Sequence, residues 1–381
     1  MEKKLLQWVE IDSSALIHNL NQFCKLVEKK KKLLAIVKAN AYGHGILEVS
    51  RIAIKVGVDW LGVSTLEEGL LLRQEGIHCP ILVVGYIPLD GLEEAVARKL
   101  RLTVYNFETI EQLAKICRHL QKKAFLHIKV ETGTYRQGIR RENLLSFIKN
   151  VQEFPELVIE GISSHFANIE DTTDHTYAKL QLEKFKKVLQ MLIKNKVEIP
   201  VKHMSCTASA ILFPKTFFDM IRIGIGMYGL WPSKETFLSS LLQEHKSFVL
   251  KPVLSWKTKV SQIKKVPMGS FIGYGCTYRT SRQTLLAVLP IGYYDGYRRH
   301  LSNSSYVLIK GKRAPIRGRV CMNFVMVEIT DIPGVNLEEE VILIGQDGEE
   351  FISADDLASL VGTINYEIVT GISAHVPRIV I

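Results

Sequence analysis

A single lysine stands at the end of an apolar run in the stretch AIVKANAYGHG, residues 35 to 45. The aliphatic residues before Lys38 predict a buried strand, so its amine would lie where that strand ends. A lysine in such a place is commonly a salt-bridge partner, but a desolvated amine can also act as a nucleophile or a base. The stretch therefore marks Lys38 as a candidate for chemistry.

A second candidate lies in RIGIGMYG, residues 222 to 229, which has the spacing G-x-G-x-x-G. No acidic residue with a following strand completes a dinucleotide-binding pattern here. The backbone N–H groups of Gly224 and Ile225, with the Thr207 hydroxyl, could instead cradle a phosphate. A phosphate there and a lysine on another strand indicate pyridoxal phosphate bound to Lys38 as a Schiff base.

The surrounding pattern predicts how these residues are positioned. Apolar strands alternate with helical stretches such as 65–76, 90–99, 107–122 and 172–195. Eight β-then-α units in about 210 residues predict a closed parallel (β/α)8 TIM-type barrel, although periodicity alone leaves an open doubly wound sheet as the alternative. The predicted strands are 33–38, 59–63, 80–84, 102–105, 124–130, 158–164, 201–205 and 219–224.

In such a barrel the active site lies at the C-terminal ends of the strands. That rule selects Lys38 after the first strand, KVETGTYRQG (129–138) after the fifth, His165 after the sixth, Thr207 after the seventh and Arg222 on the eighth. Several polar groups at one rim make a site there a stronger interpretation than an isolated salt bridge.

From about residue 250 the pattern changes to short apolar strands between turn residues, at 253–260, 284–292, 305–311, 324–329 and 340–345. We therefore expect a barrel over residues 11–245 and a mostly β C-terminal domain over 246–381. The opening segment, residues 1–10, reads as a strand that pairs with the second domain.

Composition excludes several classes of protein. The chain has 381 residues, 47% hydrophobic and 23% charged, as globular proteins have. No apolar run reaches the ~18 residues of a membrane span, and the N-terminus lacks a signal-peptide pattern, so we expect a cytoplasmic protein. The six cysteines and 11 histidines show no metal-ligand spacing. The net charge of +10 could suit nucleic acid, but the excess is spread out, and a small anionic ligand would suit it equally well.

The sequence resembles the bacterial alanine racemases, fold type III pyridoxal-phosphate enzymes, over essentially its whole length. AIVKANAYGHG resembles the cofactor-lysine signature of that family. The other stretches that carry the resemblance follow in the family's order: KVETGTYRQG, SSHFA, MIRIGIGMYG, VPMGSFIGYGCTY, LPIGYYDGY, GRVCMN and INYEI.

The resemblance implies racemisation by two bases on opposite faces of the substrate. Lys38 would carry the cofactor and act as one base, and Tyr274 of a partner subunit would be the other, so the enzyme would be a homodimer with shared active sites. Arg222 would face the pyridine nitrogen, and Arg136 would donate to the phenolic oxygen of the cofactor. His165 would link Arg222 with Tyr274. Such an enzyme supplies D-alanine for peptidoglycan.

The resemblance also implies binding residues. Met322 of the partner subunit would meet the substrate carboxylate with its backbone N–H, alongside Arg136. Lys129 matches a position that is carbamylated in some relatives. The residues that would hold the phosphate are Tyr42, Thr207, Gly224, Ile225 and Tyr366.

The roles implied for Tyr274 and Arg222 depend on the pKa values of their side chains. A tyrosine that acts as a base near pH 7 needs its pKa lowered by about three units from ~10, which is roughly 4 kcal/mol. Neutral hydrogen bonds supply ~1 kcal/mol each, so positive charge relayed from Arg222 through His165 must contribute most. A guanidinium with a pKa above ~12 does not protonate the pyridine nitrogen, which should suppress transamination.

Two alternatives to an alanine racemase remain open at this point. A racemase for larger amino acids is one alternative, although Tyr366 should favour a methyl side chain. A non-catalytic pyridoxal-phosphate carrier is another, but such proteins resemble the barrel alone. The departures from the family pattern are Cys206 for Asn, Thr207 for Ser, Thr134 for Met, Gln137 for an aliphatic residue, Asn323 for Asp and His375 for Arg.

Overall fold

The computed structural model describes residues 5–27, 31–242 and 248–381 and divides into two compact units. One unit comprises residues 14–41 and 49–251 and contains the barrel. The other comprises residues 1–13, 42–48 and 252–381 and is rich in β-strands. The domain boundary expected at residue 245 lies outside the described residues.

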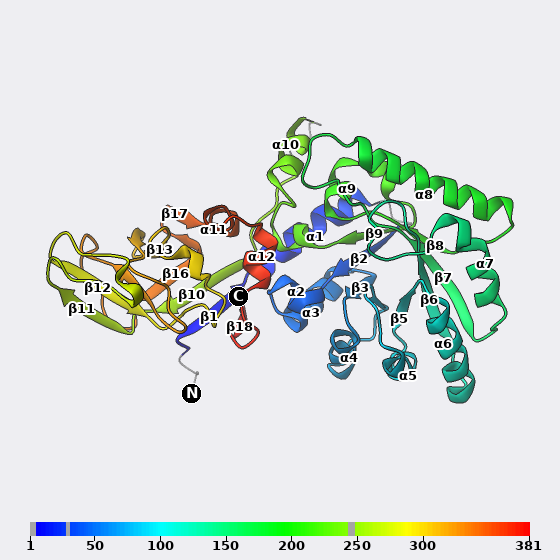
Figure 1. Ribbon diagram of the computed structural model, residues 1–381, viewed down its shortest axis with the longest axis horizontal. Coiled ribbons are helices and arrows are strands. Elements are labelled where there is room, and N and C mark those ends of the chain that lie inside the picture. Colours follow the sequence, from blue (N-terminus) through cyan, green and yellow to red (C-terminus); the bar gives the residue numbers. More distant parts are fainter. Residues whose placement is uncertain (1–4, 28–30, 243–247) are drawn as a thin grey trace. The chain divides into compact units, whose positions relative to one another are not determined.

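Eight parallel strands form the barrel, in the order β8-β7-β6-β5-β4-β3-β2-β9 (Figure 1). The two end strands meet through backbone hydrogen bonds from Asp219 N–H to Lys202 O (3.0 Å) and from Arg222 N–H to Ser205 O (3.3 Å). The prediction of a barrel is therefore confirmed over an open sheet. Its strands are β2 Lys32–Ile36, β3 Trp60–Val63, β4 Ile81–Val83, β5 Arg101–Val104, β6 Ala124–Lys129, β7 Leu157–Ser163, β8 Val201–His203 and β9 Met220–Ile223.

Amphipathic helices surround these strands (Figure 1). In α6, Phe107–Leu120, residues Ile110, Leu113 and Cys117 are buried at helical spacing, and Asn106 caps the first turn by accepting from Thr109 N–H (3.0 Å). The other helices among the described residues up to 251 are α1 Ser13–Leu26, α3 Ile46–Val56, α4 Leu66–Gln74, α5 Leu92–Ala97, α7 Arg141–Gln152, α8 Thr176–Lys194, α9 Thr207–Leu212 and α10 Lys234–Leu242. The segment labelled α2, Lys38–Tyr42, has a left-handed backbone from Ala39 onward.

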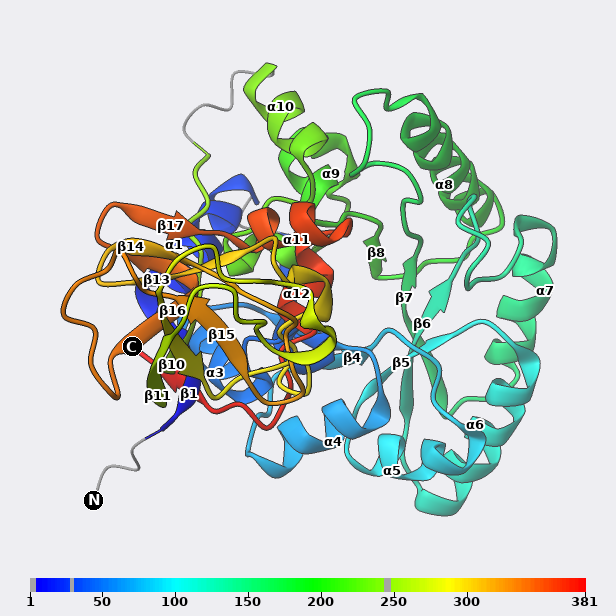
Figure 2. The same cartoon turned by 60° about the vertical axis from the view of Figure 1, so that its left-hand side comes forward.

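The β-rich unit contains a larger sheet, ordered β14-β13-β16-β10-β1-β18 with β17 paired to β16, and a three-stranded sheet, β11-β12-β15 (Figure 2). Strand β1, Gln7–Ile11, pairs antiparallel with β10, Leu254–Lys259. Trp256 of β10 is buried against Tyr297, with ring centroids 5.9 Å apart. The other strands are β11 Gln262–Val266, β12 Thr284–Leu289, β13 Tyr306–Ile309, β14 Lys312–Pro315, β15 Val325–Glu328, β16 Glu340–Asp347, β17 Glu350–Ile352 and β18 Arg378–Val380.

Two helices in this unit, α11 Ala354–Val361 and α12 Asn365–Thr370, were not expected from the sequence. They pack on each other, and α12 carries Tyr366. Among the described residues, no helix combines the length and the apolarity that crossing a bilayer would require.

Candidate active site

Lys38 begins a left-handed turn. The four residues that follow it, Ala39, Asn40, Ala41 and Tyr42, all have φ between 52° and 54°. None of them is glycine, and a left-handed conformation costs roughly 1–2 kcal/mol for each such residue. Strain of this size is retained where the surrounding structure over-determines the backbone, and it concentrates at functional sites.

Glu68 of α4 helps to hold this turn. Its carboxylate accepts hydrogen bonds from Ala39 N–H (2.5 Å) and from Ser64 N–H (2.7 Å). The same glutamate closes a capping box with Thr65 at the start of α4. Glu68 therefore connects the end of β3 with the turn after β2, at the rim where Lys38 lies.

Burial and nearby charge change the acidity of Lys38. Burial lowers the pKa of its ammonium group, the positive charge of Arg136 lowers it further, and Glu68 opposes both. A lowered pKa raises the fraction of neutral amine near pH 7. The pKa of Lys38 is thus shifted in the direction that favours a role as nucleophile or base.

Arg222 of β9 lies at the same rim and is 6% exposed. Its NH1 nitrogen lies 2.7 Å from His203 Nδ1, and its NH2 nitrogen lies 3.2 Å from His165 Nδ1. NH2 also donates to the carbonyl oxygens of Ser164 (2.9 Å) and Met204 (3.0 Å). These contacts fix the orientation of the guanidinium on the ends of β7 and β8.

The charge states around Arg222 are consistent with this geometry. Burial lowers the pKa of the guanidinium to about 10, so it stays protonated at neutral pH. Burial and neighbouring cations hold the pKa of His165 and of His203 well below the usual value. Both imidazoles are therefore neutral, and each can accept a hydrogen bond from Arg222 at Nδ1.

The last residue of β6, Lys129, and Arg136 in the loop that follows add two basic side chains to this rim. Burial, with the charges of Arg222 and Arg136, holds the pKa of Lys129 well below its usual value. Glu131 fastens the loop by accepting from Thr134 N–H (2.7 Å), and the Thr134 hydroxyl donates to His165 O (2.8 Å). The hollow at this place is lined by Lys129, Val130, Glu131, Thr134, Arg136, Gln137, Ser164 and His165.

Thr207 and Gly224 come together beside the C-terminal ends of β8 and β9. Gly224 N–H donates to Thr207 Oγ1 (3.1 Å). A Cβ on Gly226 would lie 2.6 Å from both Thr207 Cγ2 and Phe23 Cζ, so only glycine allows this approach. Ile225 starts the 3-10 turn Ile225–Tyr228 directly after Gly224. The backbone and hydroxyl thus form a compact group of the kind that cradles a phosphate.

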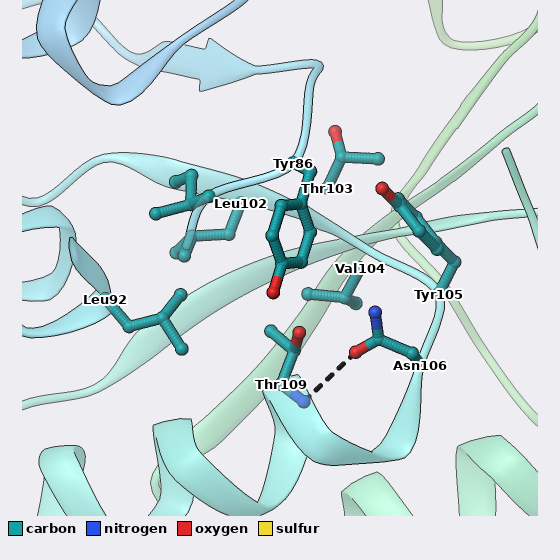
Figure 3. Close-up of a pocket in the computed structure, with 9 residues that line it drawn as sticks. Tyr86, Leu92, Leu102, Thr103, Val104, Tyr105, Asn106 and Thr109 are labelled. Atoms are coloured by element: carbon teal, nitrogen blue, oxygen red, sulfur yellow. Dashed lines mark hydrogen bonds between the residues drawn. The ribbon is translucent and has the colours of Figure 1, made fainter. Parts of the chain in front are cut away.

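A neighbouring hollow lies at the end of β5 (Figure 3). The rings of Tyr86 and Tyr105 lie on either side of Val104, and the Asn106–Thr109 cap lies at its base. Gln137 donates its side-chain N–H to Tyr105 Oη (3.3 Å), which ties this hollow to the loop that carries Arg136.

In the β-rich unit, Tyr274 and Met322 lie in adjacent loops. Both are exposed, Tyr274 by 74% and Met322 by 54%. Ile272 lies in the loop that carries Tyr274, and Gly318 lies in the loop that carries Met322. A Cβ on Gly318 would lie 2.5 Å from Ile272 O, so the two loops are in close contact here. Tyr294 N–H donates to Met322 O (3.0 Å).

Tyr42 and Tyr366 also come together in this unit, with ring centroids 6.0 Å apart. The following residue, Gly43, has φ of 83°, and a Cβ there would lie 1.9 Å from Val369 O. Arg378 donates to Gly43 O (2.8 Å). The turn that carries Tyr42 therefore packs closely against helix α12, which carries Tyr366.

Two residues that depart from the family pattern have clear environments. His375 Nε2 lies 2.8 Å from the buried carboxylate of Asp295, and its ring stacks on Tyr294 at 4.9 Å. Asp295 also accepts from Gly292 N–H (2.8 Å), so His375 supports the turn beside Met322. Cys206 is buried and is the N-cap residue that precedes α9, and burial raises the pKa of its thiol to about 11.

The structure thus brings Lys38, Arg222, His165, Lys129 and Arg136 to one rim of the barrel. Sequence reasoning missed two residues that hold them. Glu68 could have been found from the capping box T-x-x-E after a predicted strand. His203 was interpreted as a satisfied core histidine, and it is indeed buried and hydrogen-bonded, but its contact with Arg222 had no signal in the sequence.

Comparisons with known proteins cover both units. The family described as alanine racemase, N-terminal domain, matches residues 11–232, and alanine racemase, C-terminal domain, matches residues 253–380. The alanine racemase of Halothermothrix orenii is 42% identical over 380 residues, covering 99% of this chain and 98% of that protein.

Solved structures of alanine racemases are similar to this chain over its whole length. Alanine racemase of Clostridium difficile 630 superposes with a TM-score of 0.93 at 34% identity, covering 100% of this chain and 97% of the other. The alanine racemase of Bacillus anthracis with bound L-Ala-P gives a TM-score of 0.93 at 38% identity, covering 100% and 96%.

Proposed function

The chain belongs to the alanine racemase family, and we propose that Lys38 and Tyr274 are the two bases of its reaction. Its activity is the interconversion of L-alanine and D-alanine, and its cofactor is pyridoxal phosphate. The observation that carries the assignment of residues is the gathering of a lysine of lowered pKa, a buried arginine and a glycine–threonine cradle at one rim of the barrel.

The chemistry of these residues fits pyridoxal phosphate. A neutral Lys38 amine is the nucleophile that an aldehyde requires. The cationic side chains around it suit an anionic ligand, and the Thr207–Gly224 group suits its phosphate. We assign Tyr42, Thr207, Gly224, Ile225 and Tyr366 to the phosphate and Arg136 to the phenolic oxygen. When bound, pyridoxal phosphate supplies the electron-withdrawing ring that acidifies the Cα–H bond.

Arg222 is assigned to the pyridine nitrogen. Its hydrogen bonds to Ser164 O and Met204 O fix the plane of the guanidinium, and its pKa of about 10 keeps its protons in place near pH 7. Arg222 therefore donates a hydrogen bond to the ring nitrogen without transferring a proton.

Proton transfer is assigned to Lys38 on one face of the substrate and to the partner subunit's Tyr274 on the other. His165 accepts from Arg222 at Nδ1, so its remaining proton is on Nε2. We assign that N–H to the phenolic oxygen of the partner subunit's Tyr274, to which it would donate a hydrogen bond. Arg136 and the backbone N–H of the partner subunit's Met322 would hold the carboxylate of the amino acid.

A homodimer is supported by the surface that carries Tyr274. We call this surface the Tyr274 face. Exposed large apolar side chains gathered on a surface indicate a protein interface. The loops that form this surface contact one another: residues 272–275 contact 318–319, and residues 293–294 contact 321–322. The exposed residues of the Tyr274 face are Phe271, Tyr274, Tyr293, Tyr294, Met322 and Phe324.

Lys129 is assigned as a carbamylated lysine. Its lowered pKa raises the fraction of neutral amine, which is the form that adds to carbon dioxide and gives a carbamate with release of one proton to solvent. The resulting carbamate would place a negative charge between Arg136 and Arg222, the two cations whose charges already act on Lys129. That charge would orient Arg136 toward the cofactor.

The two predicted domains divide this work. We assign cofactor binding to the barrel, residues 11–245, and the second base to residues 246–381, with residues 1–10 leading into the β-rich unit. We propose, as expected from the sequence, that the protein acts in the cytoplasm and supplies D-alanine for peptidoglycan.

Mixing two inactive variants tests the shared site. Lys38→Ala and Tyr274→Phe each remove one base. If the bases come from different subunits, each mixed dimer contains one intact site, and random exchange should restore about a quarter of the wild-type activity. If both bases of a site come from one chain, no mixture can regain activity, and the assignment of Tyr274 to the partner is wrong.

A further inference from the structure

A chain of hydrogen-bonded side chains connects Arg222 with Glu160, the middle residue of strand β7. His203 Nδ1 lies 2.7 Å from Arg222 NH1, and His203 Nε2 lies 2.8 Å from His127 Nδ1. His127 Nε2 then lies 3.3 Å from Glu160 Oε2. His127 and His203 are buried, at 0% and 1% exposure, and Glu160 is only partly exposed, so water has little access to the contact between the two rings. The chain joins a cation to an anion through two imidazoles.

The direction of every hydrogen bond in this chain is fixed from both ends. A guanidinium can only donate, so His203 Nδ1 accepts and His203 carries its proton on Nε2. That proton is donated to His127 Nδ1, so His127 also carries its proton on Nε2 and donates it to Glu160. An ionised carboxylate can only accept, so the opposite end requires the same assignment. A proton added to either ring would set two donors against each other.

The backbone is built to aim Glu160 at His127. The register between β6 and β7 shifts so that Leu126 faces Ile159 while His127 faces Gly161, which leaves Glu160 as the extra residue of a bulge. Bulges re-aim side chains and are uncommon between parallel strands. A Cβ on Gly161 would lie 2.3 Å from His127 Nδ1, so glycine makes the space for the ring.

We propose that Glu160 is a remote positioning residue for the racemase reaction, acting through His127 and His203 to orient the guanidinium of Arg222. The inference rests on the role assigned to Arg222 under the proposed function. Without the carboxylate, His127 is free to move its proton to Nδ1. His203 must then present a proton to Arg222, and the guanidinium loses an acceptor that helps to hold its plane.

An ordinary salt bridge is the competing explanation. Arg101 Nε also lies 3.3 Å from Glu160 Oε2, and its guanidinium lies over the ring of Trp60. Burial would raise the pKa of Glu160, but its contacts with His127 and Arg101 outweigh burial and lower it. If Glu160 served only to pair with Arg101, removing either partner would have the same effect on the histidine tautomers and on the reaction.

The test compares Glu160→Leu, Glu160→Gln and Arg101→Met with a matched control, Glu156→Leu. Glu156 lies next to the start of β7 and also pairs with an arginine, Arg118 at 3.2 Å, but contacts neither histidine. The first measurement is the 15N chemical shifts of the imidazoles in protein freed of pyridoxal phosphate. The second is the ratio of racemisation to transamination in the holoenzyme.

We expect both imidazoles to carry their proton on Nε2 in the wild type, in Arg101→Met and in the control. Glu160→Leu should give a mixture of tautomers and lower the racemisation-to-transamination ratio about tenfold, as the loss of one hydrogen bond to a charged group would. Glu160→Gln keeps an acceptor oxygen and should rescue most of both effects. If Glu160→Leu fails to fold, Gly161→Ala should displace the His127 ring and shift the same tautomers.

Unchanged tautomers in both Glu160→Leu and Gly161→Ala would overturn the inference, as would an equal effect of Glu160→Leu and Arg101→Met. A failure of the proposed function looks different. In that case Arg222→Leu leaves the racemisation-to-transamination ratio unchanged, whereas the tautomers still respond to Glu160.

Discussion

The cradle formed by Thr207, Gly224 and Gly226 makes a quantitative prediction about cofactor affinity. Thr207→Val is nearly isosteric and removes only the hydroxyl. If that hydroxyl binds the phosphate, its loss removes a hydrogen bond to a charged group, which contributes about 1.5–3 kcal/mol. The dissociation constant for pyridoxal phosphate should then rise about 10- to 150-fold, while Thr207→Ser should stay close to the wild type.

Gly226→Ala perturbs the same cradle from the opposite side. The new methyl group would lie 2.6 Å from Thr207 Cγ2 and from Phe23 Cζ, so one of them must move. Overpacking of this kind costs about 1–3 kcal/mol of stability. Thr207→Ser removes one of the two obstructing atoms and keeps the hydroxyl. The double variant should therefore bind the cofactor more tightly than Gly226→Ala alone.

The assay is a fluorescence titration of the cofactor-free protein with pyridoxal phosphate, combined with urea unfolding to separate affinity from stability. Wild-type affinity in Thr207→Val would refute the assignment of the hydroxyl. Strict additivity of Gly226→Ala and Thr207→Ser would show that the two residues do not share the cradle, since contacting residues normally couple.

Three further predictions concern residues at the same rim. The pKa values of the buried His127, His165 and His203 are lower in the folded state than the unfolded value near 6.5, so the unfolded chain binds more protons below that pH. As the pH is lowered from 6.5 to 5, the free energy of unfolding should therefore fall by up to about 1.4 kcal/mol per pH unit for each histidine. A free energy of unfolding that does not change with pH in urea titrations would contradict this prediction. Glu68→Gln should destabilise the turn after Lys38 by about 1–3 kcal/mol in unfolding experiments, because Ala39 N–H loses a charged acceptor. Its neighbour Glu67→Gln should have a smaller effect, and equal losses would remove Glu68 from that role. Bicarbonate labelled with 13C should give a carbamate resonance that Lys129→Arg abolishes, and a spectrum without that resonance in the wild type would exclude carbamylation at neutral pH.

The barrel strands could be predicted because both faces of a parallel strand are buried, which leaves continuous apolar runs in the sequence. The rim residues followed from the rule that barrel sites lie at strand C-termini. The left-handed turn at 39–42 could not be foreseen, because its residues include no glycine to signal positive φ. Tertiary contacts, including the one from Glu68, hold a conformation that local preference disfavours.

The β-rich unit was predicted less completely. Strand β11 has two adjacent lysines, Lys264 and Lys265, and is mostly exposed, so it lacks the alternation that marks a half-buried strand. Helix α11 does carry a signal in the sequence, the capping box of Ser353 and Asp356, but this signal directly follows a segment with the pattern of a strand. The bulge at Glu160 is a matter of register between two strands, and no single-strand pattern contains it.

Deuterium uptake at Cα from each isomer of alanine tests the two-base assignment most directly. Tyr274→Phe should slow exchange from L-alanine by about 100-fold or more, as loss of a general base does, and affect D-alanine much less. Lys38→Ala should abolish covalent attachment of the cofactor. Equal slowing of both isomers by Tyr274→Phe, or exchange from L-alanine at the wild-type rate, would contradict the placement of the two bases on opposite faces.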